Sequence, residues 1–143
     1  MSEKKHLPGV PWLLVDTSAV VAIAHRRDEH HNRAIFLLQQ AHEAGAVFML
    51  TNFLLAEAYS LLLIRGGADL AREWLRDNDI PVYRITETDE AKALEILFKY
   101  NDKDFSYVDA TSFAAMESLA LNTAFIFDQH FRQFGWQAWG DNR

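Results

Sequence analysis

The sequence predicts an α/β fold in which helices flank a mostly parallel β-sheet. Short apolar runs of strand length recur along the 143 residues, and longer segments with a helical pattern separate them. Several of these runs are apolar throughout instead of alternating with polar residues. Strands of that kind are buried on both faces, which requires a layer of helices on each side of the sheet.

The expected strands are short runs rich in β-branched, aromatic or continuous apolar residues. They cover residues 10–15, 47–50, 81–85 and 124–127, and residues 136–139 allow a fifth short strand. The helices are expected in the other segments, over residues 18–24, 32–44, 52–65, 68–78, 89–99 and 106–121. Gly45 interrupts the chain just before the second strand.

Local chemistry supports the boundaries of two of these helices. Thr51 or Asn52 can cap the third predicted helix at its start. Gly66 and Gly67 end that helix by permitting a left-handed turn. Residues 88–90 bring acceptors and negative charge to the start of the fifth helix, where free amides and the helix dipole favour them.

Composition narrows the class of protein. No repeat or linker divides the chain, so a single domain over residues 1–143 is expected. The absence of cysteine excludes disulfides, thiolate metal ligands and cysteine nucleophiles, and it suits a reducing cytosol. The apolar stretch over residues 12–24 is too short to span a bilayer, and residues 1–9 lack a signal-peptide core. These features predict a cytoplasmic protein with no membrane association.

Four carboxylates stand almost alone among apolar neighbours: Asp16, Glu57, Asp109 and Asp128. Glu57, for example, is the only charge between residues 51 and 64. An acid at the edge of a core is costly, because burial removes water that apolar neighbours cannot replace. One or two Mg²⁺ or Mn²⁺ ions would neutralise a converging acidic cluster. The pattern therefore predicts a metal-dependent enzyme that cleaves phosphodiesters.

The predicted elements place these acids near one another. Asp16 and Asp128 sit at the carboxyl ends of predicted parallel strands, where open α/β sheets have their ligand crevice. Glu57 lies about one and a half turns into the third helix, and Asp109 lies in the first turn of the last. All four side chains can reach one edge of the sheet.

Two of the acids also have a purely structural interpretation. Asp16 can cap the helix that it precedes, and Thr17 and Ser18 can supply hydroxyls there to the cap, to metal-bound water or to phosphate. Ser106 and Asp109 have the spacing of a capping box, although Glu or Gln usually closes it. Capping is compatible with a role in catalysis.

The other acids have structural interpretations too. Glu57 could form a buried salt bridge with an arginine, and Asp128 could begin a turn. Asp104 is expected to be a solvated acid in a turn rather than a metal ligand. His130 is either a phosphate contact or a structural histidine.

The formal net charge of −6 is unusual for a protein that binds nucleic acid. Neutralising the four acids would leave −2, which no longer excludes RNA. Basic groups near two of these acids either steer phosphate or form a solvated surface, namely His25, Arg26, Arg27, His30, His31, Arg33, His130 and Arg132.

Four segments containing the acids resemble the acidic motifs of PIN-domain ribonucleases, and their order and spacing are most like those of VapC-type toxins of type II toxin–antitoxin systems. The segments are Leu14-Val15-Asp16-Thr17-Ser18, Leu54-Leu55-Ala56-Glu57, Ser106-Tyr107-Val108-Asp109-Ala110-Thr111-Ser112-Phe113 and Phe127-Asp128-Gln129-His130-Phe131. Asp28, His31 and Ala34 also resemble an Asp-x-x-His-x-x-Ala stretch of such toxins.

The resemblance implies a Rossmann-like PIN fold, a three-layer sandwich with helices on both sides of the sheet. It implies a Mg²⁺- or Mn²⁺-dependent endoribonuclease in which Asp16, Glu57, Asp109 and Asp128 bind metal and catalyse hydrolysis. It also implies an RNA substrate, a homodimer and a small cognate antitoxin that blocks the site.

Other functional classes fit the sequence less well. A phospho-receiver domain needs a phosphoacceptor Asp on a middle strand and a Lys near the last strand, and the corresponding segments supply neither. A haloacid-type phosphatase needs Asp-x-Asp after the first strand, where Ser18 stands in place of the second Asp. A PIN-like interaction module with weak or no nuclease activity remains the alternative.

Overall fold

The computed structural model describes residues 9–128 and 130–141. Nearly all of the segment 1–9, which was expected to lack a signal-peptide core, therefore lies outside the described residues. In the described part of the chain, none of the helices is both long and apolar enough to cross a membrane.

The strands of the described chain form one parallel sheet. They are β1 (Trp12–Val15), β2 (Val47–Thr51), β3 (Val82–Tyr83), β4 (Thr123–Phe125) and β5 (Gln137–Ala138). Their order across the sheet is β3-β2-β1-β4-β5, and every neighbouring pair is parallel. The predicted α/β class is thus confirmed, and the segment that allowed a fifth strand does contain one.

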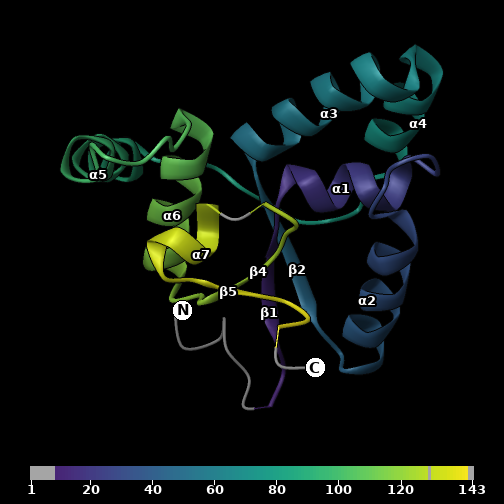
Figure 1. Ribbon diagram of the computed structural model, residues 1–143, viewed down its shortest axis with the longest axis horizontal. Coiled ribbons are helices and arrows are strands. Elements are labelled where there is room, and N and C mark those ends of the chain that lie inside the picture. The colour runs from purple at the N-terminus through teal and green to yellow at the C-terminus, as the bar shows by residue number, and fades with distance from the viewer. Residues whose placement is uncertain (1–8, 129, 142–143) are drawn as a thin grey trace.

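Helices cover both faces of this sheet (Figure 1). They are α1 (Thr17–Ala24), α2 (His31–Glu43), α3 (Asn52–Gly66), α4 (Ala68–Asp77), α5 (Glu87–Lys99), α6 (Tyr107–Leu119) and α7 (His130–Phe134). In Figure 1, α1, α2 and α4 lie to the right of the strands, α6 and α7 lie to the left, and α3 runs from the top of the sheet to the right. This is the expected three-layer arrangement, with α7 as a short helix that the sequence did not predict.

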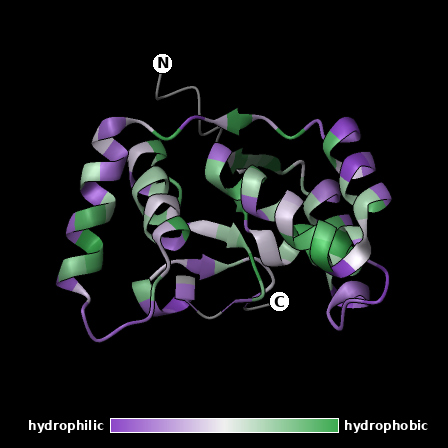
Figure 2. Cartoon of the chain, turned by 90° about the horizontal axis from the view of Figure 1, so that it is seen from above, coloured by the Kyte–Doolittle hydropathy of each residue, from purple (hydrophilic) through white to green (hydrophobic). Residues whose placement is uncertain are grey.

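The core explains why the strands are apolar throughout. Leu13 and Leu14 are neighbours on β1, so their side chains point to opposite faces of the sheet, and both are fully buried. Phe125 on β4 and Phe113 on α6 are also fully buried. Figure 2 shows the complementary pattern on the outer helices, where hydrophilic and hydrophobic bands alternate along the ribbon.

The ends of α3 agree only in part with expectation. Thr51 is the cap, since its Oγ1 accepts a hydrogen bond from the amide of Leu54 at 3.0 Å. Asn52 serves another purpose, because its side chain accepts from the amide of Ile85 at 2.8 Å. Gly67 has φ 96° and ψ 167°, which is not the left-handed helical turn expected but is a conformation that essentially only glycine adopts.

The start of α5 was predicted too late. Thr86 caps this helix, and its Oγ1 accepts a hydrogen bond from the amide of Asp89 at 3.0 Å. The Asp89 carboxylate accepts in return from the amide of Thr86 at 3.0 Å, which completes a capping box. Asp89 is only 2% exposed, so the chain buries an acid that its polar sequence neighbours did not reveal.

The order of the strands creates a crevice beside β1. From β1 the chain moves outward through β2 to β3, and it then returns to the other side of β1 to form β4 and β5. The connections that leave β1 and β4 therefore run in opposite directions from neighbouring strand ends. Open parallel sheets bind ligands at such a switch point, on the carboxyl side of the strands.

Candidate active site

The four predicted acids line one pocket at this switch point. The pocket has a volume of about 280 Å³, and we call it the acid pocket. It is lined by Asp16, Thr17, Ser18, Glu57, Leu61, Arg65, Ser106, Asp109, Asp128 and His130. These residues come from the ends of β1 and β4 and from α1, α3, α6 and α7.

Asp16 joins β1 to α1 and is 7% exposed. Its Oδ2 accepts hydrogen bonds from the amide of Ser18 at 2.9 Å and from the Ser18 hydroxyl at 2.8 Å. The Ser18 Oγ in turn accepts from the amide of Phe127 at 2.9 Å, which ties the end of β1 to the loop after β4. Asp16 is therefore a helix cap, as its structural interpretation required, and it also faces the acid pocket.

The environment of Asp16 favours its neutral form. Burial raises the pKa of its carboxyl from the ordinary value of 3.8 to about 7, and this effect exceeds the lowering by the hydrogen bonds from Ser18. The negative charges of Asp109 and Glu57 raise it further. A nearby cation would reverse this balance by stabilising the carboxylate.

This pKa predicts that the metal-free protein becomes less stable as the pH rises. At pH values below 3.8, Asp16 is protonated in both the folded and the unfolded chain. Between 3.8 and about 7 the unfolded chain releases the proton while the folded chain keeps it, so the free energy of unfolding falls. The loss from this group is at most about 4 kcal/mol and is complete above pH 7.

Urea melts in EDTA at a series of pH values would measure this effect. Asp16→Asn is the reference, because its side chain does not titrate. We expect the stability of the original chain, relative to this variant, to fall between pH 3.8 and about 7 and to change little above that. Parallel stability curves for the two proteins would contradict the pKa assigned to Asp16.

Glu57 reaches the acid pocket from the middle of α3. Glu57, Leu61 and Arg65 are spaced four residues apart, so they share one face of the helix, and all three line the pocket. The Thr17 hydroxyl donates a hydrogen bond to Oε1 of Glu57 at 2.7 Å. No arginine or lysine of the described chain forms an ion pair with Glu57, so the salt bridge considered for it is not found.

Asp109 and Asp128 meet at the imidazole of His130. The Nδ1 atom of His130 lies 2.7 Å from Oδ2 of Asp109 and 3.3 Å from Oδ1 of Asp128. Asp109 also forms the expected capping box with Ser106, with distances of 3.0 and 2.9 Å. Asp128 lies three residues beyond the end of β4, and its Oδ1 accepts from the amide of His130 at 2.7 Å.

His130 thus contacts two of the acids, a role that the sequence left open. Its position two residues after Asp128 was the available signal, but α7, which carries it, was not predicted. Asp104 lies outside the acid pocket and is exposed in the turn before α6, as expected.

The donor chemistry of the acid pocket suits a hard divalent cation. Carboxylate oxygens are the preferred ligands of Mg²⁺ and Mn²⁺. However, no three acidic or histidine side chains of the described residues form a ready-made metal centre. Glu57 is engaged with Thr17, and Asp109 and Asp128 are engaged with His130. The carboxylates would therefore have to turn in order to share an ion.

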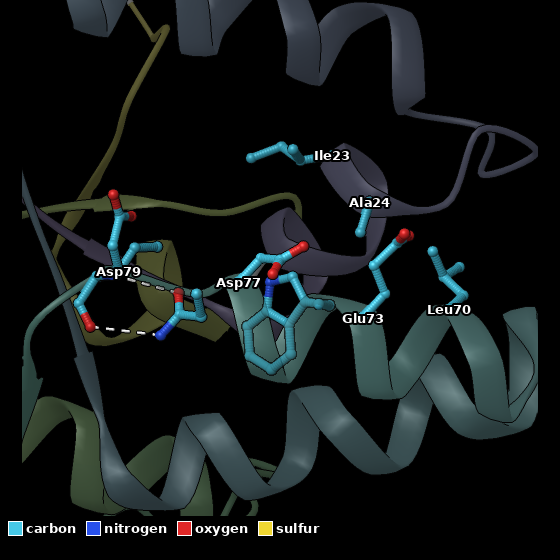
Figure 3. Close-up of a pocket in the computed structure, with 9 residues that line it drawn as sticks. Ile23, Ala24, Leu70, Glu73, Asp77 and Asp79 are labelled. Atoms are coloured by element: carbon cyan, nitrogen blue, oxygen red, sulfur yellow. Dashed lines mark hydrogen bonds between the residues drawn. The ribbon is translucent and has the colours of Figure 1, made fainter.

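A different cavity of about 380 Å³ lies between α1 and α4 (Figure 3). Its walls include Ile23 and three acids, Glu73, Asp77 and Asp79. These acids are exposed, and Asp77 pairs with Arg76 at 3.0 Å. They therefore lack the burial that distinguishes Asp16, and none of them was a predicted site residue.

Comparisons with known proteins agree with this arrangement. The PIN domain family model matches residues 13–137. The 23S rRNA-specific endonuclease VapC20 of Mycobacterium tuberculosis, from strains CDC 1551 and H37Rv, is 32% identical over 126 residues, which cover 86% of this chain and 94% of VapC20. The crystal structure of M. tuberculosis VapC20, described as a Sarcin-Ricin loop cleaving toxin, matches with a TM-score of 0.77 and 31% identity, covering 87% of this chain and 95% of that chain. These comparisons confirm the resemblance drawn from the acidic motifs, and the chain therefore belongs to the PIN domain family.

Proposed function

We propose that the chain is a Mg²⁺- or Mn²⁺-dependent endoribonuclease and the toxin of a type II toxin–antitoxin pair. The observation that carries this proposal is the acid pocket, where the four predicted acids meet from separate segments at the switch point of the sheet. PIN domains typically depend on a metal ion, and the homologous VapC20 is a ribosomal RNA endonuclease.

The residues of the acid pocket have distinct parts in the proposed reaction. Asp16, Glu57, Asp109 and Asp128 would hold one or two ions. A bound ion supplies hydroxide near neutral pH and stabilises the negative charge that develops on the phosphodiester oxygens. Thr17 orients Glu57 through its hydroxyl, and Ser18 fixes Asp16 against the end of β4.

The proposal extends to substrate and partners by homology with VapC20. Because that relative is named as specific for 23S rRNA and as cleaving the sarcin-ricin loop, we propose ribosomal RNA as the substrate class. A cognate antitoxin that blocks the acid pocket and a homodimeric state complete the proposal.

We expect purified protein to cleave an RNA hairpin carrying the sarcin-ricin loop when Mg²⁺ or Mn²⁺ is present. Cleavage should stop when EDTA removes the metal. Glu57→Gln should lower the cleavage rate by about 100-fold or more, because glutamine keeps the shape and an acceptor for Thr17 but loses the charge. Gel analysis of cleavage products measures both effects.

Glu95→Gln is the matched control, since Glu95 is an exposed acid of α5 outside the acid pocket. Its cleavage rate should equal that of the original protein. Cleavage that continues in EDTA, or equal rates for Glu57→Gln and Glu95→Gln, would overturn the metal-dependent mechanism.

One observation favours the alternative of an interaction module with weak or no hydrolysis. The described acids and histidines do not form a ready-made metal centre. In that case the original protein would show no cleavage above Glu57→Gln at any Mg²⁺ or Mn²⁺ concentration, including with intact ribosomes as substrate.

A further inference from the structure

A second, larger pocket opens directly beside the acid pocket. Its volume is about 610 Å³, and we call it the outer pocket. It shares Ser18, Arg65 and Asp128 with the acid pocket, and most of its remaining wall comes from residues 25–30, between α1 and α2. A polymer with one phosphodiester in the acid pocket would therefore have its neighbouring unit at the outer pocket.

Two arginines of the outer pocket have no acidic partner among residues 9–128 and 130–141. Arg65, in the last turn of α3, and Arg27 are both exposed. Neither forms an ion pair or a side-chain hydrogen bond within the described parts of the chain. Their guanidinium donors are thus available to a ligand, and guanidinium groups match the geometry of phosphate oxygens.

The acids of the outer pocket are already engaged with other groups. Oδ1 of Asp28 accepts a hydrogen bond from the amide of His30 at 2.8 Å. The Glu29 carboxylate lies 3.3 Å from Nε2 of His30, and Asp128 contacts His130. None of these contacts involves Arg65 or Arg27.

A flat aromatic wall completes the outer pocket. The rings of His30 and Phe127 are stacked, with centroids 4.7 Å apart and planes inclined by 6°. This pair joins the loop before α2 to the loop after β4. Flat aromatic surfaces of this kind accept nucleobases by stacking regardless of sequence.

We infer that the outer pocket binds the nucleotide next to the scissile phosphodiester, with Arg65 and Arg27 on its phosphate. This inference rests on the proposed ribonuclease function and adds a binding site to it. Arg65 is the central residue, because it faces both pockets from the same side of α3 as Glu57. By binding the neighbouring phosphate, Arg65 would position the scissile phosphodiester of the RNA against the acids of the acid pocket.

Binding can be measured separately from cleavage in Glu57→Gln, using a fluorescein-labelled sarcin-ricin loop hairpin and fluorescence anisotropy. Adding Arg65→Gln should weaken binding about 5- to 10-fold and make the slope of log affinity against log salt shallower by about 0.7–0.9, as for one lost phosphate contact. Adding Arg65→Lys instead should restore part of the affinity, because the charge returns without the fork of donors.

Arg72→Gln in the same background is the matched control, since Arg72 is an exposed arginine of α4 that lines neither pocket. Arg72→Gln changes the net charge by the same amount as Arg65→Gln. If Arg65→Gln and Arg72→Gln have equal affinities and salt slopes, the outer pocket is not the nucleotide site, even if the original protein cleaves RNA. If Arg65→Gln alone weakens binding but the original protein does not cleave, the site stands and only the nuclease proposal fails.

Discussion

Replacing Asp16 with Asn is expected to reduce metal-dependent RNA cleavage by roughly 100- to 1,000-fold while leaving the chain folded. Asparagine is a good helix cap, and its amide oxygen can still accept from the amide of Ser18. What it cannot supply is the negative charge of a ligand for the ion. Activity should therefore be lost at the step that the metal assists, without loss of the fold.

The same variant should lose its thermal response to Mg²⁺. An ion that binds only the folded protein stabilises it by about 2.7 kcal/mol at a concentration one hundred times its Kd. We expect Mg²⁺ to raise the Tm of the original protein and to have little effect on Asp16→Asn. The matched control is Asp104→Asn, because Asp104 is an exposed acid outside the acid pocket. Equal Mg²⁺ shifts in all three proteins would contradict metal binding by Asp16.

Replacing Asp89 with Ala is expected to destabilise the protein by about 2–3 kcal/mol. The Asp89 carboxylate accepts hydrogen bonds from the Tyr83 hydroxyl at 2.7 Å, the Ser118 hydroxyl at 2.7 Å and the amide of Thr86 at 3.0 Å. Burial alone would raise its pKa, but these hydrogen bonds outweigh burial and lower it. Truncation would remove the acceptor that these three donors share, and water can replace it only in part, at the exposed residues Thr86 and Ser118.

Thermal melts at neutral pH would test this expectation, with a fall in Tm of about 10 °C. Asp69→Ala is the control, because Asp69 also lies in the first turn of a helix but is exposed. It should cost no more than about 1 kcal/mol. Equal stability losses in the two variants would show that the Asp89 bonds contribute little.

The contribution of Asp89 to stability also depends on pH. Because the folded state depresses the pKa of Asp89, this contribution is present above pH 4 and is lost as the pH falls through the lowered value.

The fold was largely predictable because burial on both faces leaves a direct mark on the sequence. Leu13 and Leu14 are neighbours on β1, so their side chains point to opposite faces of the sheet. Two apolar residues in succession therefore indicate that both faces of β1 are covered. Helix ends were harder to place, since they depend on single hydrogen bonds. Thr86 rather than residues 88–90 begins α5, because its hydroxyl meets the amide of Asp89.

The acids of the pocket were identifiable because their sequence neighbours are apolar. Asp89 was expected at a helix start, but its burial was not predicted, because it lies in a polar stretch and its hydrogen bonds come from Tyr83 and from Ser118, which is 29 residues away in the chain. The sequence did not identify Arg65 as a ligand-binding residue, because that role depends on which face of α3 meets the pocket. Such features arise from tertiary packing and leave no local pattern.

The hydrogen bond between Ser18 and the amide of Phe127 joins positions separated by 109 residues. During synthesis, Asp16 would leave the ribosome long before the segment that holds it in place. A nascent chain therefore has no complete acid pocket until β4 and the loop after it have been made and paired with β1. If the protein cleaves ribosomal RNA, this late assembly would keep it inactive toward the ribosome that is translating it.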